Sequence, residues 1–183
     1  MGTEENRLNE ISKFLSYVLR HQPDAIGLQL DDQGWGDIDS LIIGANKQGH
    51  KINRSVIQTV VAINDKRRFT ISNDGQRIRA LQGHSTTDVR LRYPEKEPPE
   101  HLYHGTATRF LHSIREEGIK PGARHHVHLS QDRQTAIAVG KRYGAPSTLK
   151  IEALRMHQQG FKFFLAENGV WLADYIPPSF IVE

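Results

Sequence analysis

The stretch FTISNDGQRIRA (69–80) decides how the first half of the chain folds. Its two ends, FTIS and RIRA, have the composition of short strands, and Asn73-Asp74-Gly75 stands between them. These three residue types tolerate the positive φ angles that a tight hairpin turn requires. The stretch therefore predicts a β-hairpin.

Three helices are predicted before this hairpin. Apolar residues recur at helical spacing through residues 8–19. The first helix should end near His21, because Pro23 disfavours helical backbone at the residue before it. Asp37 is expected to cap the second helix and Ser55 the third. Helices followed by a hairpin are typical of a small winged-helix-like domain.

The stretch YPEKEPPE (93–100) separates the two halves of the chain, because its three prolines and four charges suit neither a helix nor a central strand. We predict a winged-helix-like lobe over 1–92, a linker over 93–100 and a second lobe over 101–183. Residues 107–117 are expected to form a helix that Gly118 ends. The strands expected in the second lobe are LYHGT (102–106), HVHLS (126–130), STLKIEA (147–153), FKFFLAE (161–167) and VWLADYI (170–176). The fold class is therefore α+β, and the second lobe should be a strongly curved mixed sheet with two helices.

Composition narrows the class of protein without naming a function. Cysteine is absent, which excludes disulfides and thiolate catalysis and fits a reducing, cytoplasmic location. No apolar run approaches the roughly 18 residues of a membrane span, and the polar start MGTEENRLNE is unlike a secretory signal. The formal net charge of +3 permits a nucleic-acid partner without requiring one. We expect a monomer with no membrane partner.

Two basic groups in the first half have alternative interpretations. Arg20-His21 should lie at the carboxyl end of the first helix, where the helix dipole favours cations. The same pair can form an anion site, because arginine binds phosphate and histidine transfers protons. Arg77 and Arg79 should share one face of the hairpin. They either protect a solvated edge strand or form a basic wing against an RNA backbone.

A histidine-rich stretch, Arg124-His125-His126-Val127-His128, stands out in the second half. His126 and His128 share a face of an extended strand, a spacing that suits a metal ion. No carboxylate or cysteine nearby completes such a site, so we predict no metal. The alternatives are a nucleotide pocket, in which Arg124 binds phosphate, and a purely structural role.

Two glycine-containing stretches bear on nucleotide binding. In His104-Gly105-Thr106, Gly105 would allow a ligand to approach the backbone closely, while the flanking side chains hydrogen-bond a ribose or an amide. The stretch GKRYG (140–144) lacks the spacing of a Walker A loop, and the sequence contains no GxGxxG. The common nucleotide-binding folds are therefore not indicated.

Taken in order, these pieces resemble the RNA 2'-phosphotransferase family, the KptA-like enzymes. The resemblance extends over nearly the whole chain, and its motifs are modest singly but specific together. The matching stretches are LSYVLRHQP (15–23), DDQGWGDIDSLI (31–42), KRRFTIS (66–72), IRALQGHS (78–85), LYHGT (102–106), RHHVHLS (124–130) and ENGVWLADYIPPSF (167–180).

The resemblance implies an N-terminal winged-helix-like RNA lobe and a C-terminal lobe of the ADP-ribosyltransferase type, with NAD as co-substrate and a role in tRNA processing. The catalytic set that it implies is Arg20, His21, Arg68 and Arg124. Because Arg67 adjoins Arg68, that assignment can shift by one residue. The NAD-binding positions that it implies are His104, Gly105, Thr106, His128, Ser130, Val139 and Gly140.

The implied reaction has two steps and needs no metal. The RNA 2'-phosphate displaces nicotinamide from NAD, giving an ADP-ribosylated RNA phosphate. The neighbouring ribose hydroxyl then attacks phosphorus, which yields RNA with a 2'-hydroxyl and ADP-ribose 1'',2''-cyclic phosphate. Protein-modifying ADP-ribosyltransferases commonly use a glutamate, where Val170 would stand here, with Glu167 three residues away.

Two other functions are consistent with the residues. One is an ADP-ribosyltransferase that acts on nucleic-acid ends or on protein. The other is a nucleic-acid-binding module whose second half is only structural, and which would not bind NAD.

Overall fold

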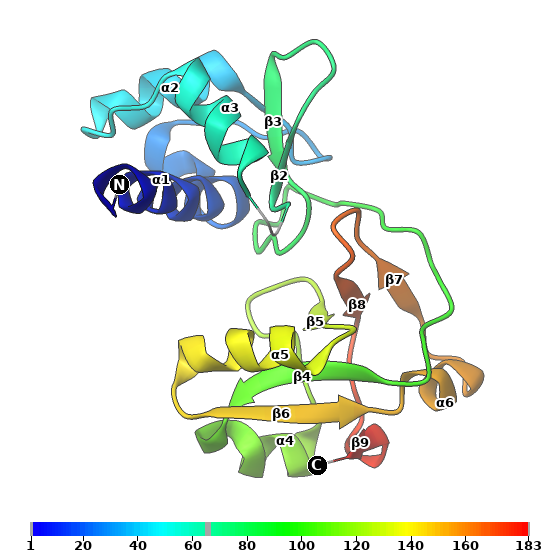
Figure 1. Cartoon of the computed structure of the whole chain (residues 1–183). Helices are drawn as coiled ribbons and strands as arrows, with labels where there is room; N and C mark the ends of the chain where they lie inside the picture. Colours follow the sequence, from blue (N-terminus) through cyan, green and yellow to red (C-terminus); the bar gives the residue numbers. More distant parts are fainter. Residues whose placement is uncertain (1, 65–66, 183) are drawn as a thin grey trace. The chain divides into compact units, whose positions relative to one another are not determined.

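The computed structural model describes residues 2–64 and 67–182, and the chain divides into two compact units, Met1–Arg92 and Tyr93–Glu183 (Figure 1). Each unit has its own cluster of buried apolar side chains. Helices and small antiparallel sheets occur in both, which confirms the α+β class. Lys66 of the KRRFTIS stretch lies outside the described residues.

The first unit opens with helices whose apolar faces form its core. Leu15, Val18 and Leu19 lie fully buried on one side of the first helix, as their spacing predicts. The elements are α1 (Gly2–Arg20), a 3₁₀ helix (Pro23–Ile26), α2 (Ile38–Lys47) and α3 (Arg54–Ala62). The predicted end of α1 near His21 is confirmed.

The caps of the next two helices test the sequence reading. The Asp37 carboxylate accepts a hydrogen bond of 2.7 Å from the Ser40 amide, so the predicted cap of α2 is confirmed. The predicted cap of α3 is wrong. Asn53 caps that helix through a 2.9 Å bond from the Val56 amide, and Ser55 lies inside the first turn. Asn is at least as good a cap as Ser and stands earlier in the chain.

The hairpin is confirmed as β2 (Phe69–Ile71) and β3 (Arg77–Ala80), paired in the register Phe69↔Ala80 and Ile71↔Ile78. A further strand, β1 (Gly36–Asp37), pairs with the other side of β3, so the order is β1-β3-β2. The second hairpin strand is therefore central in its sheet. The interpretation of Arg77 and Arg79 as protection for a solvated edge strand is wrong, because both edges of β3 are paired.

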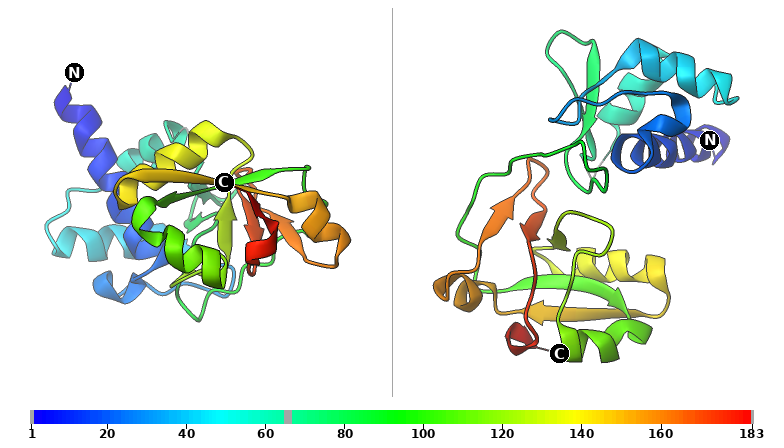
Figure 2. Two further views of the ribbon diagram at one scale, coloured as in Figure 1. Left: turned by 90° about the horizontal axis from the view of Figure 1, so that it is seen from below. Right: turned by 180° about the vertical axis from the view of Figure 1, so that it is seen from behind.

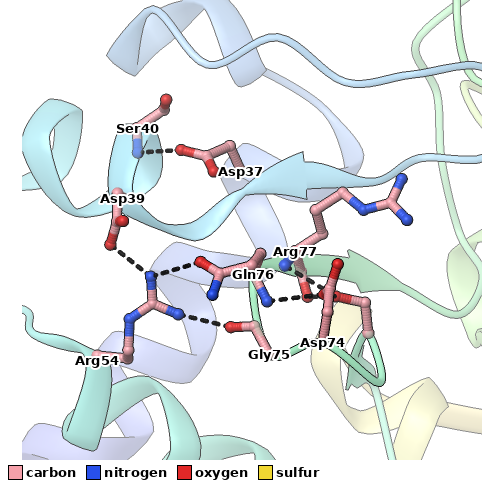
Figure 3. Close-up of polar contacts among 9 residues, drawn as sticks. Asp37, Asp39, Ser40, Arg54, Asp74, Gly75, Gln76 and Arg77 are labelled. Carbon is pink, nitrogen blue, oxygen red and sulfur yellow. Dashed lines mark hydrogen bonds and ion pairs between the residues drawn. The ribbon is translucent and has the colours of Figure 1, made fainter.

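The hairpin turn is fastened to the helices by one arginine (Figure 3). The Arg54 guanidinium, at the start of α3, donates to the Gly75 carbonyl at 2.5 Å and to the Asp39 carboxylate at 2.6 Å. Within the turn, the Asp74 carboxylate accepts from the Gln76 amide at 3.0 Å, as Asp in a tight turn often does. These contacts hold the tip of the hairpin beside the starts of α2 and α3.

The second unit contains two three-stranded sheets, ordered β4-β6-β9 and β5-β8-β7. Two hydrogen bonds of 2.8 Å between Tyr103 and Ser130 join β4 to the end of β5. The strands are β4 (Leu102–Ala107), β5 (Val127–Leu129), β6 (Pro146–Ile151), β7 (Phe163–Leu165), β8 (Trp171–Ala173) and β9 (Ile181–Val182). The prediction of a mixed sheet is wrong for the described residues, whose strand pairs are all antiparallel. The short β7–β8 turn suits an antiparallel pair, whereas a parallel pair needs a long crossover.

The described residues of the second unit form three α-helices rather than the predicted two. They are α4 (Leu111–Glu117), α5 (Arg133–Gly140) and α6 (Ala153–Gln158). Gly118 ends α4 with a φ of 75°, as predicted. In Figures 1 and 2, α5 lies along one side of the β4–β6 pair and α4 along the other. No helix in the described part of the chain has the length and apolar character to span a membrane.

The segment 93–100, predicted to be a linker, is part of the second unit. The Lys96 amide donates to the Phe163 carbonyl at 2.9 Å, and the Pro94 carbonyl accepts from the Leu165 amide at 3.2 Å. The segment thus runs along β7. Proline tolerates this position because an edge segment can offer its carbonyls without an N–H at every residue.

Candidate functional site

Arg20 ends α1 and is almost fully buried, with 7% of its surface exposed. Gly83 lies against its side chain, so that a Cβ added there would be 3.6 Å from the Arg20 Nε. Gly83 also has a φ of 90°, which an L side chain rarely adopts. The backbone conformation therefore favours glycine at this position, which lies in van der Waals range of the Arg20 side chain.

His21 follows directly and contacts a serine distant in sequence. Its Nδ1 lies 2.9 Å from the Ser85 hydroxyl oxygen, 64 residues further along the chain. The Ser85 amide donates to the Arg20 carbonyl at 2.9 Å. One residue thus contacts both members of the Arg-His pair.

Arg68 immediately precedes β2, and its side chain contacts α1. It is half-buried, and its Nη1 donates to the Ser12 hydroxyl of α1 at 3.3 Å. Arg67 is exposed and has a φ of 41° in the turn before β2. Arg68 is thus the more buried of the two arginines, and its catalytic role stays a prediction.

A small cavity adjoins Arg68 between α1 and the end of α3. Its volume is about 190 Å³. Its walls are mixed, with amide, hydroxyl and guanidinium groups facing aliphatic side chains. The lining residues are Leu8, Asn9, Ser12, Val60, Ile63, Asn64 and Arg68. Arg68 therefore borders open space large enough for a small polar group.

The segment Leu81–Ser85 connects the three candidates of the first unit. The Leu81 amide donates to the Arg68 carbonyl at 2.9 Å, and the far end of the segment contacts Arg20 and His21 as described. Five residues span at most about 17 Å when fully extended. The structure therefore gathers Arg20, His21 and Arg68 around one short segment.

The two arginines of the hairpin lie against a tryptophan ring. The Arg77 and Arg79 guanidinium carbons lie 5.5 and 4.6 Å from the centre of the Trp35 ring, within cation–π range. Arg77 also pairs with the Asp31 carboxylate at 3.7 Å. Part of the positive charge expected on this wing is thus balanced by a neighbouring carboxylate.

Arg124, the fourth candidate, belongs to the second unit. It is half-buried in the loop between α4 and β5, where its amide donates to the Pro121 carbonyl at 3.3 Å. Its position just before β5 matches the expectation of an arginine ahead of the HVHLS strand.

His104 lies on β4 in a defined tautomer. Its Nδ1 is 3.1 Å from the His128 carbonyl oxygen, and because a carbonyl only accepts, Nδ1–H must donate. Burial lowers the pKa of His104, with the bond to His128 acting in the opposite direction. The imidazole is therefore neutral near pH 7 and presents Nε2 as a hydrogen-bond acceptor.

This tautomer has a consequence for stability. The pKa of His104 is lower in the folded state than in the unfolded state. The neutral imidazole therefore contributes fully to the free energy of unfolding above about pH 6.5, and this contribution is lost as the pH falls. We expect the melting temperature to decrease less between pH 7 and pH 5 in His104→Asn, whose amide keeps a donor but cannot titrate. Thermal unfolding of both proteins across this range measures the difference. If the melting temperatures of both proteins changed equally with pH, the lowered pKa of His104 would be contradicted.

The remaining NAD candidates surround the same strand pair. Thr106 is 5% exposed and shares a face of β4 with His104, and Ser130 pairs with Tyr103 at the β4–β5 junction. Val139 and Gly140 end α5, which packs on the opposite face of β4. His104, His128 and Ser130 therefore do lie close together.

Gly105 lies where α5 crosses β4. A Cβ added there would lie 1.8 Å from the Ala136 carbonyl oxygen of α5, and one added at Gly140 would lie 2.5 Å from the Thr106 carbonyl oxygen. Both glycines allow α5 to cross β4 closely. The helix backbone fills the space on the Cβ side of Gly105, and the expectation that Gly105 binds NAD stays a prediction.

His126 contacts aromatic and acidic side chains of the second unit. Its ring lies edge-on to Tyr93 and Phe164, and its Nε2 is 3.6 Å from the exposed Asp174 carboxylate. Burial lowers the pKa of His126, although Asp174 raises it. The described residues contain no group of three or more His, Cys, Asp or Glu side chains that could hold a metal ion.

A valine, not a glutamate, directly precedes β8. Val170 is half-buried directly before β8, while Glu167 is exposed in the β7–β8 turn. The Ala166 amide donates to the Val170 carbonyl at 2.9 Å and closes this turn. Glu167 thus sits in the turn, and a valine precedes the strand.

Comparison with known proteins decides the family. The family model for RNA 2'-phosphotransferase, Tpt1/KptA family, matches residues 6–175, which is most of both units. The chain belongs to the Tpt1/KptA family of RNA 2'-phosphotransferases. It is therefore an enzyme, an RNA 2'-phosphotransferase.

Relatives in this family align over almost their whole length. A probable RNA 2'-phosphotransferase of Burkholderia lata is 60% identical over 188 residues, covering 100% of this chain and 97% of the relative. Those of Pseudomonas fluorescens and Pectobacterium carotovorum are 59% and 58% identical, covering 95% and 94% of this chain and 96% and 92% of the relatives. The chain is thus similar to Tpt1/KptA proteins over both units.

Sequence reasoning missed three residues that contact the candidates of this Tpt1/KptA chain. Ser12, Gly83 and Ser85 touch Arg68, Arg20 and His21. Gly83 and Ser85 lie in the last three residues of IRALQGHS (78–85), a stretch that the resemblance included without assigning a role to these residues. This stretch could therefore have pointed to Gly83 and Ser85, whereas no motif in the sequence pointed to Ser12.

Proposed function

We propose that the chain removes an internal 2'-phosphate from RNA by passing it to NAD. The observation that carries this proposal is the clustering of Arg20, His21 and Arg68 around Leu81–Ser85. Two guanidinium groups and an imidazole form a fitting environment for a phosphate dianion, which arginine binds through charge-assisted hydrogen bonds. Family membership supplies the substrate class.

The first unit is proposed to be the RNA lobe, of the winged-helix type. Its helices α1–α3 followed by the β2–β3 hairpin support this assignment. The RNA is proposed to be a tRNA or another RNA carrying a 2'-phosphate. A cytoplasmic location is proposed because a chain without cysteine fits a reducing compartment, and a monomer is proposed as well.

The second unit is proposed to hold NAD in a lobe of the ADP-ribosyltransferase type. The chemistry of its donors and acceptors fits a ribose or an amide. The neutral His104 offers Nε2 as an acceptor, and Thr106 offers a hydroxyl on the same face of β4. Ser130 and His128 lie at the adjoining end of β5.

The reaction is proposed to proceed in two steps. An ionised oxygen of the RNA 2'-phosphate attacks the anomeric carbon of the nicotinamide ribose, and the bond to nicotinamide breaks with its electron pair. The adjacent ribose hydroxyl then attacks phosphorus, and the bond from phosphorus to the RNA 2'-oxygen breaks. The proton of the attacking hydroxyl is passed on, and RNA leaves with a 2'-hydroxyl together with ADP-ribose 1'',2''-cyclic phosphate.

The residues have separate tasks in this scheme. Arg20, Arg68 and Arg124 stabilise the phosphate charge, which is the largest contribution expected for such a reaction. His21 transfers the proton in the second step, since imidazole titrates near neutral pH. The phosphate itself is the nucleophile in the first step, which fits a valine rather than a glutamate before β8.

The test is incubation with NAD and a 2'-phosphorylated oligonucleotide, following RNA species and nicotinamide together. We expect phosphate loss only with NAD, equimolar nicotinamide release, and full activity in EDTA, because arginines take the electrostatic role of a metal. Activity lost in EDTA and restored by magnesium or zinc would contradict the metal-free mechanism. A stable ADP-ribosylated product without phosphate transfer would instead indicate an ADP-ribosyltransferase.

A further inference from the structure

We propose that Ser85 is a positioning residue that holds the His21 ring for proton transfer, an inference that rests on the proposed function of His21. Its hydroxyl oxygen is 2.9 Å from His21 Nδ1, and its amide is 2.9 Å from the Arg20 carbonyl oxygen. One serine thus contacts both Arg20, the last residue of α1, and His21, which follows it.

The backbone contact fixes where the hydroxyl stands. The last carbonyls of an α-helix lack partners within the helix. The Ser85 amide supplies one for Arg20, so the serine is attached to the helix end that carries His21. Its short side chain then reaches Nδ1 with a single rotatable bond, and the ring orientation follows from the backbone.

A hydroxyl suits a histidine that changes its protonation state. It donates to Nδ1 when that nitrogen carries no proton, and it accepts from Nδ1–H when it does. The contact therefore survives in both states. Because Nδ1 remains bonded to Ser85, proton transfer to the substrate takes place at Nε2.

Neutrality at this position matters as much as hydrogen bonding. Gly83, two residues earlier, lies against the Arg20 guanidinium, and Leu81 pairs with the backbone of Arg68. A carboxylate in place of the hydroxyl would attract these arginines and raise the pKa of the imidazole. Serine orients His21 while leaving the positive charge available to a phosphate.

The experiment compares Ser85→Ala, Ser85→Cys and Ser85→Thr with the wild-type chain, and uses the exposed Ser113→Ala as a matched control. We expect kcat to fall roughly 10- to 100-fold in Ser85→Ala, with KM for NAD unchanged, as for a loss of general acid–base efficiency. Ser85→Thr, which keeps the hydroxyl, should stay within about threefold of wild type. Ser85→Cys preserves volume and should resemble Ser85→Ala.

A spectroscopic measurement separates positioning from folding. The ¹⁵N signals of the His21 ring, assigned with His21→Asn, should shift more at Nδ1 than at Nε2 in folded Ser85→Ala. Wild-type kcat in Ser85→Ala, an unchanged Nδ1 signal, or equal loss in folded Ser85→Thr would overturn the proposal. This readout needs no turnover, so a wild-type chain that fails to transfer phosphate would contradict the proposed function without deciding the Ser85 contact.

Discussion

Replacing Gly105 with alanine is expected to unfold the second unit at temperatures where the wild-type unit remains folded. The new Cβ would lie 1.8 Å from the Ala136 carbonyl oxygen and 2.7 Å from its carbonyl carbon. Both are backbone atoms of α5, so no side-chain rotation relieves the overlap. The helix must move away from β4, and the apolar contacts between them are lost.

The size of this effect follows from what the crossing holds together. Forced overlap in a packed interior commonly costs 1–3 kcal/mol even when side chains can adjust. Here the backbone itself must shift, so we expect a loss of roughly 4 kcal/mol or more in the free energy of unfolding. Thermal and urea unfolding of the purified variant measures this loss.

Two other glycines calibrate the measurement. Gly140→Ala, with its Cβ 2.5 Å from the Thr106 carbonyl oxygen, should be strongly destabilising as well. Gly122→Ala lies in open space with a φ of 66° and should cost only about 1 kcal/mol. If Gly105→Ala proved no worse than Gly122→Ala, the close crossing of α5 over β4 would be wrong.

The Gly105 result also shows where sequence reasoning stops. Local chemistry predicted the hairpin from Asn73-Asp74-Gly75 and the end of α4 from Gly118, because both depend on neighbouring residues alone. A glycine on a strand has several possible reasons, and only the packing partner tells them apart. That partner, Ala136, is on a helix that joins the strand only in the folded unit.

The errors at element ends have the same cause. Asn53 and Ser55 both suit a helix cap, and the choice depends on where the chain turns into α3. Prolines in 93–100 indicated a linker, but an edge segment beside β7 accommodates them. In each case the residue chemistry was interpreted correctly, and the tertiary neighbour decided the outcome.

For the site, family resemblance identified residues that physics alone left ambiguous. Arg20 at a helix end is equally a dipole cap and an anion ligand. The structure adds the contacts between distant residues, such as Ser12 with Arg68 across 56 positions. No periodicity in the sequence encodes such a pairing, which explains why Ser12 and Ser85 were missed.

Replacing His21 or Arg68 with alanine is expected to let an ADP-ribosylated RNA phosphate accumulate. In the first step of the proposed reaction the nucleophile is an ionised phosphate oxygen, so no base is required. In the second step a neutral hydroxyl attacks phosphorus, and negative charge must be stabilised while the bond to RNA breaks. Proton transfer and charge stabilisation thus matter more in the second step.

The expected rate loss is large. Removing one charge-assisted contact to the transition state costs roughly 2–4 kcal/mol, which corresponds to about 30- to 1000-fold in rate. Arg67→Ala is the matched control. It removes the same positive charge from the neighbouring residue, whose side chain is exposed. We expect that variant to stay within a few-fold of wild type, whereas Arg68→Ala should resolve the intermediate slowly.

A gel time course of RNA species distinguishes the possible divisions of labour. Accumulation of the intermediate in His21→Ala and Arg68→Ala, but not in Arg67→Ala, would support separate roles for the two steps. Wild-type turnover in both, or a block of the first step with no intermediate, would show that the division is wrong.

The contact of Arg68 with Ser12 provides a further test. If the geometry of the Arg68 guanidinium matters as well as its charge, Arg68→Lys should also be impaired. A single ammonium cannot bind phosphate through two parallel N–H groups and keep the contact with Ser12 at the same time.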